Sequence, residues 1–255
     1  MQLRKALSVV ALIALVTLAA CGGGAEAPAP TADESAPASN LPDLSQAGAV
    51  AGTVAFSGEV QAQAIQMAAD PFCQQAHSEV VMRSPVMVDA EGGLSNVVVH
   101  VAAGLDGYTF PVPGESLLLD QVGCIYEPHV LAARTGQTII FQNSDDTLHN
   151  VNVQPVNNPA FNEGQPLKGM TSEKQFMNAE IGIPARCDVH PWMSAFVSVF
   201  DHPYFSVSGT DGAFDLDRLP PGDYVIEAWH ETLGTQTQSV SVAPNEPTSL
   251  TISFE

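Results

Sequence analysis

The sequence predicts an all-β fold made of two β-sandwiches. Short segments rich in Val, Ile, Phe and Thr alternate apolar with polar residues, which is the period of a half-buried strand. Twenty glycines and nineteen prolines, many of them between these segments, supply the turns. The one long apolar run typical of a helix lies at the N-terminus. Many short strands separated by turn residues favour a sandwich over any helical architecture.

The expected strands run along the whole body of the chain. They are Thr53–Phe56, Asn96–Val101, Leu117–Leu119, Val130–Ala133, Thr138–Gln142, Asn150–Val153, Ala195–Phe200, Ala213–Leu216, Tyr224–Trp229, Gln236–Val242 and Ser249–Phe254.

The first twenty residues predict an exported protein. Arg4 and Lys5 precede the apolar run 6–20, which is shorter than the roughly 20 residues of a membrane span and fits a signal peptide. Leu18-Ala19-Ala20-Cys21 resembles the lipobox of bacterial lipoproteins, in which the cysteine after the cleavage site carries the lipid. This resemblance implies lipidation of Cys21 and a place in the bacterial cell envelope, facing the periplasm. The alternative is an ordinary secretory signal in which Cys21 is incidental.

Residues 21–47 predict a disordered tether. They are rich in Ala, Pro, Ser and Glu and offer little apolar surface to bury. Gly22, rather than Asp, follows the predicted lipid cysteine and favours the outer membrane if an enteric-type sorting rule applies.

The charge of the chain excludes one class of partner. The net charge is −20 at pH 7, with 28 acidic residues against eight basic ones. Such a surface repels phosphate backbones, so we expect no nucleic-acid binding. A basic protein partner, or simply solubility, fits this charge.

The segments 48–114 and 202–255 resemble the carboxypeptidase regulatory-like (transthyretin-like) sandwich. The turn 219–224, LPPGDY, leads into a strand, and the stretches 51–58 and 94–101 stand where that family has its first two strands. The resemblance implies a discontinuous, generally non-catalytic domain that is interrupted by a second one.

The interrupting region, residues 115–201, contains a second pattern. Two strands lead through Asn143-Ser144-Asp145 to His149-Asn150-Val151, and a loop with the spacing Cys187-x2-His190-x2-Met193 follows before an apolar strand. These motifs, in this order, resemble the cupredoxins, the small blue copper proteins of the amicyanin and plastocyanin type. The resemblance implies a Greek-key β-sandwich with one type 1 copper.

The donor set supports that resemblance chemically. Two imidazoles (His149, His190) and a thiolate (Cys187), with a weak axial thioether (Met193), suit a copper that cycles between two oxidation states. A zinc site would more often offer a fourth Cys, His or carboxylate. Asn143 and Asn150 are placed to hold the loops, and one of them could donate a hydrogen bond to the Cys187 sulfur.

The function implied is single-electron transfer with a redox partner such as a cytochrome or a dehydrogenase, and the membrane is reached through the lipid anchor. In related proteins the imidazole equivalent to that of His190 reaches the surface, so His190 is the expected exit route. The alternative is a module that holds copper without redox turnover, or that binds protein or glycan. An enzyme is not expected, because the sequence has no His-x-His pair for further copper ions and no catalytic triad pattern. We therefore assign no catalytic residue.

The cysteines predict one disulfide. In an oxidising compartment two of Cys73, Cys124 and Cys187 should pair. If Cys187 binds copper, then Cys73 and Cys124 remain; the alternative is that Cys187 is itself half of a disulfide. Of the other histidines, His100 is expected on the solvent face of a strand, His129 near the site or at the surface, and His77 outside any metal site.

Overall fold

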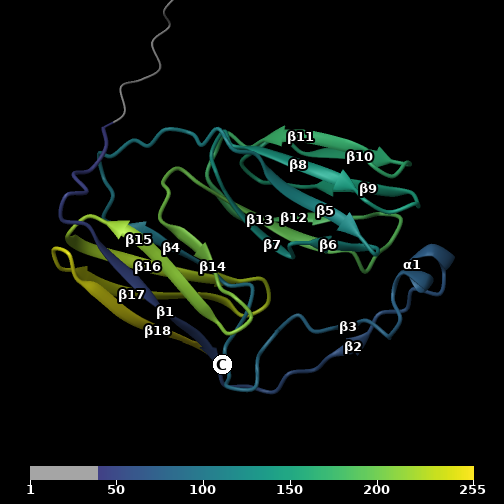
Figure 1. The fold of residues 1–255 in the computed structure, drawn as a ribbon, viewed down its shortest axis with the longest axis horizontal. Coiled ribbons are helices and arrows are strands. Elements are labelled where there is room, and N and C mark those ends of the chain that lie inside the picture. The colour runs from purple at the N-terminus through teal and green to yellow at the C-terminus, as the bar shows by residue number, and fades with distance from the viewer. Residues whose placement is uncertain (1–39) are drawn as a thin grey trace, which may run out of the picture. The chain divides into compact units, whose positions relative to one another are not determined.

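The computed structural model describes residues 40–255, and nearly all regular structure in this range is β (Figure 1). The all-β prediction is confirmed. The predicted signal peptide and Cys21 lie outside the described residues. Within those residues, no helix is long and apolar enough to cross a membrane.

The first sandwich, here called the split sandwich, joins segments from both ends of the described chain. In one sheet β1 lies between β15 and β18, and the other sheet has the order β14-β4-β16-β17. Because β1 runs parallel to β18 along eight residue pairs, the sheet forms only when the two ends of the body meet. The strands are β1 (Gly48–Phe56), β4 (Val98–Ala103), β14 (Phe205–Val207), β15 (Ala213–Leu219), β16 (Gly222–His230), β17 (Gly234–Val242) and β18 (Pro247–Phe254).

Alternating burial explains why these segments are strands. In β16 Tyr224, Ile226 and Ala228 are buried while their neighbours are more exposed, and Leu250, Ile252 and Phe254 alternate in the same way in β18. Successive side chains of a strand point to opposite faces, so each strand buries one row of its residues. The buried rows of both sheets form one apolar core. The assignment of this sandwich to the regulatory-like family stays a prediction.

The second sandwich, here called the continuous sandwich, is built from consecutive strands between residues 117 and 200. Its sheets have the orders β10-β9-β12-β13-β7 and β11-β8-β5-β6, and Leu119, Ile139, Phe141 and Ile183 lie in the core between them. The strands are β5 (Leu117–Val122), β6 (Ile125–Glu127), β7 (Val130–Arg134), β8 (Thr138–Asn143), β9 (His149–Val153), β10 (Phe161–Gln165), β11 (Thr171–Gln175), β12 (Glu180–Arg186) and β13 (Ser194–Phe200).

A small apolar cluster connects the two sandwiches. Val98 of β4 packs with Val130 and Phe200 of the continuous sandwich. The rings of Phe196 and Trp229 meet edge to face at 5.6 Å. The two sandwiches therefore share a packed contact through which the position of one constrains the other.

One segment leaves the split sandwich although it was expected to be part of it. Residues 57–91, here called the cap segment, depart after β1, and the chain returns where Phe56 N–H donates to the Gly92 carbonyl at 2.9 Å. The cap segment contains β2 (Gln63–Ala64), α1 (Pro71–Ala76) and β3 (Met82–Arg83). Figure 1 shows α1 at the end of the continuous sandwich, beyond β5 and β6.

Helix α1 was not predicted from the sequence. Asp70 is its N-cap and accepts from the backbone N–H groups of Phe72 and Cys73, while Pro71 occupies the first helical position. The predicted disulfide between Cys73 and Cys124 is confirmed, with a Cα–Cα distance of 5.5 Å. It ties α1 to the turn between β5 and β6.

The end of the predicted tether lies on the folded body. The Asn40 N–H donates to the Thr109 side-chain hydroxyl, the Thr109 N–H donates to the Asn40 carbonyl, and the Asn40 side chain donates to the Gly107 carbonyl at 2.7 Å. Pro42 is buried. Residues 40–47 are thus ordered, contrary to the expectation of disorder up to residue 47.

The close approach of β1 and β18 provides a test of the split sandwich. A Cβ at Gly52 would lie 1.7 Å from the Leu250 carbonyl oxygen, so Gly52→Ala must push the two strands apart. We expect the free energy of unfolding to fall by about 1–3 kcal/mol, as for other overpacked sites. Urea denaturation measures this. Gly164→Ala is the matched control, because a Cβ there meets nothing within 4 Å. Equal effects of the two variants would contradict the assigned pairing.

Candidate metal centre

The loop between β12 and β13 carries two donor groups. Arg186 pairs with Ser194 across this antiparallel hairpin, so residues 187–193 form a tight connection between the strands. Cys187 N–H donates to the Met193 carbonyl at 3.2 Å, and Met193 N–H donates to the His190 carbonyl at 2.9 Å. These bonds fold the loop back on itself, so the side chains of Cys187 and His190 meet.

His149 reaches the same point from the neighbouring strand. It is the first residue of β9, which pairs with β12 through Ala185–Val153 and Arg186–Asn152. This register brings the start of β9 beside the loop that follows β12. His149 is completely buried there.

Three donor atoms form a compact triangle. His149 Nδ1 lies 3.0 Å from His190 Nδ1, and Cys187 Sγ lies 3.9 and 3.8 Å from these two nitrogens. The point equidistant from all three atoms is about 2.1 Å away from each, which is close to the length of a metal–imidazole bond. His149, Cys187 and His190 also form one of the groups in the described residues that could hold a metal ion. Three of the four ligands predicted from the sequence are therefore brought together.

Each imidazole binds a carboxylate on the side away from the triangle. His149 Nε2 lies 2.9 Å from Asp145 Oδ2, and His190 Nε2 lies 3.1 Å from Asp70 Oδ2. An ionised carboxylate accepts but does not donate, so we assign the proton to Nε2 in both rings. The Nδ1 atoms then present their lone pairs to a shared ion or proton.

Asn150 fixes the loop around the sulfur. Its Oδ1 accepts from the backbone N–H groups of Asp188 at 2.7 Å and Val189 at 3.3 Å, and it lies 3.5 Å from Cys187 Sγ. Because this oxygen faces the sulfur, the Asn150 amide cannot be the expected N–H donor.

Asn143 orders the segment that leads to His149. Its Nδ2 donates to the carbonyls of Thr147 and Gln165, and its Oδ1 accepts from Asp145 N–H at 2.8 Å. Both predicted asparagines therefore hold loops, one on each side of the triangle.

Tyr126 is a supporting residue that sequence reasoning missed. Its hydroxyl lies 3.1 Å from the Asn150 carbonyl and 3.3 Å from the Arg186 carbonyl, so it bridges β9 and the end of β12. Burial raises the pKa of Tyr126, with a further contribution from the charges of Cys187 and Asp188. Nothing in the sequence marks this tyrosine, because its partners are backbone atoms.

The surroundings favour an ionised thiol. Burial by itself raises the pKa of Cys187, but hydrogen bonds from His149, His190 and the Asn150 backbone outweigh it and lower the value to about 6. Burial also lowers the pKa of His149, yet its bonds to Asp145 and Cys187 and their charges raise it to about 9. The metal-free site therefore holds a thiolate beside an imidazolium near neutral pH. A thiolate is the form that binds metals.

Asp145 and Asp70, whose carboxylates contact the two imidazoles, were not predicted from the sequence as site residues. Asp145 also accepts from the backbone N–H groups of Gly123 and Cys124, both at 2.7 Å. Partial burial raises the pKa of Asp70, but hydrogen bonds from Cys73, His190, Thr147 and Phe72 outweigh it and hold the pKa below its usual value. Two signals were available: Asp145 stands four residues before His149, and Asp70-Pro71 is a helix-start pattern.

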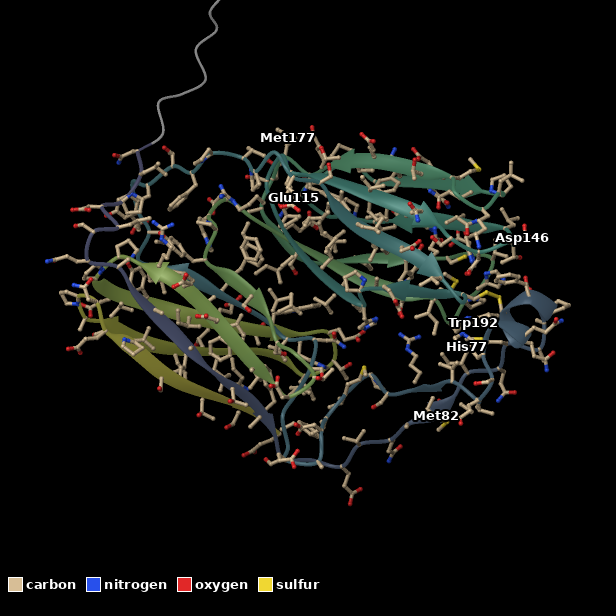
Figure 2. All side chains as sticks on the ribbon, viewed as in Figure 1. His77, Met82, Glu115, Asp146, Met177 and Trp192 are labelled. Carbon is tan, nitrogen blue, oxygen red and sulfur yellow. A yellow bond between two sulfur atoms is a disulfide. The ribbon has the colours of Figure 1, made fainter. Side chains whose placement is uncertain are left out.

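The expectation that the His190 imidazole reaches the surface is wrong. His190 is only 2% exposed, because Asp70 and α1 of the cap segment cover its outer edge. Trp192 packs on it, with ring centroids 5.0 Å apart, and donates from Nε1 to the Cys124 carbonyl. Figure 2 shows Trp192 and His77 near α1.

The remaining candidates take no part in the triangle. Met193 is buried below the loop, and its role as the axial ligand stays a prediction. His77 Nε2 contacts the Gly123 carbonyl, and His129 contacts Ser194 and Glu231. His100 is buried at 6% exposure against Phe200, so its expected solvent-facing position is wrong.

The donors fit a soft or borderline metal better than a hard one. A thiolate with two imidazoles suits copper or zinc, whereas magnesium and calcium require oxygen ligands. The carboxylates of Asp70 and Asp145 bind the rings and do not enter the triangle. They act on any bound ion through the imidazoles.

Comparison with known proteins gives partial likenesses to copper proteins. The chain matches no protein-family model and none of the curated proteins. It is similar to a Cu-containing nitrite reductase from Thermus scotoductus SA-01, at 22% identity over 40% of this chain and 26% of that chain, with a TM-score of 0.32.

Two smaller copper proteins are also similar. A purple cupredoxin from Nitrosopumilus maritimus is 26% identical over 33% of this chain and 97% of its own, with a TM-score of 0.28. An amicyanin variant in its Cu(I) form is 22% identical over 34% of this chain and 85% of its own, with a TM-score of 0.31.

The low pKa of Cys187 can be tested without metal. We expect thiolate absorbance in the ultraviolet to appear as the pH rises through about 6, because hydrogen bonds stabilise the thiolate. His149→Gln removes the imidazolium and should move this transition towards the usual value of about 8.5. Cys187→Ser provides the baseline. A wild-type transition at the usual thiol value would contradict the assigned hydrogen bonds.

Proposed function

We propose that this chain is a type 1 copper protein that transfers single electrons. The observation that carries the proposal is the triangle of His149 Nδ1, His190 Nδ1 and Cys187 Sγ, in which a buried thiol is already stabilised as a thiolate. Copper, when bound, would supply a one-electron couple. Met193 is proposed as the weak axial ligand.

The residues around the triangle support fast electron transfer by limiting movement. The loop 187–193 is closed by its own backbone bonds, and Asn150 holds it to β9. Both imidazoles are fixed by carboxylates. Ligands held in this way keep their positions when the charge of the site changes, so little reorganisation is required.

The location and partner complete the proposal. Lipidation at Cys21 would anchor the protein to the membrane of a bacterial cell envelope, facing the periplasm, with the outer membrane favoured. The net charge of −20 fits a basic redox partner such as a cytochrome or a dehydrogenase. No catalytic reaction is proposed.

A second candidate function is supported by the cover over His190. At 2% exposure, its imidazole offers no surface edge to a partner. This cover would suit a module that holds copper for delivery or storage without redox turnover.

Copper titration tests the leading proposal. We expect one equivalent of Cu(II) to give an intense visible absorption and a type 1 EPR signal, because thiolate coordination generates both. Cys187→Ser should abolish them while the fold, followed by circular dichroism, is kept. His77→Gln is the control, since His77 lies outside the triangle, and it should leave the spectrum unchanged. A colourless wild type, or colour that survives in Cys187→Ser, would refute the proposal.

Voltammetry separates the two candidate functions. An electron carrier should show a reversible one-electron wave and exchange electrons rapidly with a small inorganic oxidant. A copper-holding module should bind Cu(I) tightly and reoxidise slowly, which is the result expected if the cover of α1 over His190 blocks electron exchange. Slow exchange in a protein with normal copper binding would favour the second candidate.

A further inference from the structure

The carboxylate of Asp70 makes four hydrogen bonds, two through each oxygen atom. Oδ1 accepts from the backbone N–H groups of Phe72 at 2.8 Å and Cys73 at 3.2 Å, which caps α1. Oδ2 accepts from Thr147 Oγ1 at 3.0 Å and contacts His190 Nε2 at 3.1 Å. One oxygen is therefore structural, and the other faces the candidate metal ligand.

The fold holds this carboxylate firmly against the ring. Cys73, three residues after Asp70, is bonded to Cys124, and the Cys124 N–H donates to Asp145 Oδ2. The same Asp145 oxygen contacts His149 Nε2. A continuous chain of contacts thus runs behind the triangle, from one imidazole through two carboxylates and a disulfide to the other imidazole.

We propose that Asp70 is a positioning residue for the copper centre: it fixes His190 with Nδ1 towards the metal and stabilises Cu(II) relative to Cu(I). This inference rests on the proposed copper function. It assigns to the cap segment a role in setting the reduction potential, in addition to covering the site.

Two physical effects point in the same direction. A carboxylate that accepts from the distal N–H of a ligating histidine makes the ring a stronger donor, which favours the more highly charged ion. The negative charge of Asp70 is also partly shielded from water, at 21% side-chain exposure, so its attraction for the additional positive charge is weakly screened. Both effects lower the reduction potential.

Asp70→Asn separates this role from the capping role. Asparagine is as good an N-cap as aspartate, so its side-chain oxygen can still accept from Phe72 and Cys73. In this variant a neutral amide N–H donor would face the His190 Nε2–H group, so both the hydrogen bond to His190 and the negative charge would be lost. Asp146→Asn is the matched control, since it removes one charge from an exposed residue of the neighbouring loop (Figure 2).

The decisive measurement is the reduction potential of the copper-loaded full chain. Loss of such an outer hydrogen bond typically weakens metal binding by about tenfold or more. A tenfold loss for Cu(II) alone raises a one-electron potential by about 59 mV. We expect at least this rise in Asp70→Asn, a clearly smaller one in Asp146→Asn, and partial return in Asp70→Glu.

A second readout does not require copper. In the metal-free protein the His190 Nε2 proton should give a slowly exchanging NMR signal that is retained in Asp146→Asn and lost in Asp70→Asn. Equal potentials for the two Asn variants, or a signal that is unaffected in Asp70→Asn, would overturn the inference while leaving the blue copper centre intact. A wild type without type 1 spectra would instead refute the proposed function, and the NMR signal would then decide whether Asp70 positions the ring.

Discussion

The candidate metal centre depends on the register between β9 and β12. With Arg186 opposite Asn152, the first residue of β9 lies beside the loop that leaves β12, and three donor atoms from β9 and this loop meet within 3.9 Å. Side chains alternate between faces of a strand, so a slip of one residue would turn His149 away from the loop. Asn150 and Tyr126 bind across this junction, and their hydrogen bonds oppose such a slip.

The two imidazole rings of the site are also held by carboxylates and by the disulfide. Asp145 binds both His149 and the turn 123–124, and the disulfide from that turn reaches the helix whose N-cap is Asp70. The disulfide therefore does more than restrict the unfolded chain, because it fixes one carboxylate relative to the other. Ligands held by two such contacts have little freedom to reorient, which is the condition for a preorganised metal site.

The three donor atoms of the triangle lie within 3.9 Å of one another without metal, and their surroundings favour an ionised thiol. The pKa of Cys187 is lowered to about 6 and that of His149 is raised to about 9, so a thiolate beside a protonated imidazole is favoured near neutral pH. A metal cation bound between the three donor atoms would stabilise the thiolate by its positive charge, as the protonated imidazole does without metal. The cap segment then covers the outer edge of His190, and all three donor residues are buried.

The sequence by itself determined the all-β class and the predicted strands, because apolar periodicity is a local property. Its resemblance to the cupredoxins implied the three converging donors, and the number of cysteines then left Cys73 and Cys124 to pair. It did not reveal β10, β11 and β12, of which β11 has no apolar residue and β12 contains Gly182 and Pro184. It also did not reveal the short elements β2, β3, β6, β14 and α1, which have at most six residues each. Burial of His190 and the contacts of Asp70 and Tyr126 were decided by tertiary structure alone. They join residues up to 120 positions apart, and the register and packing that bring such residues together leave no mark in the chain between them.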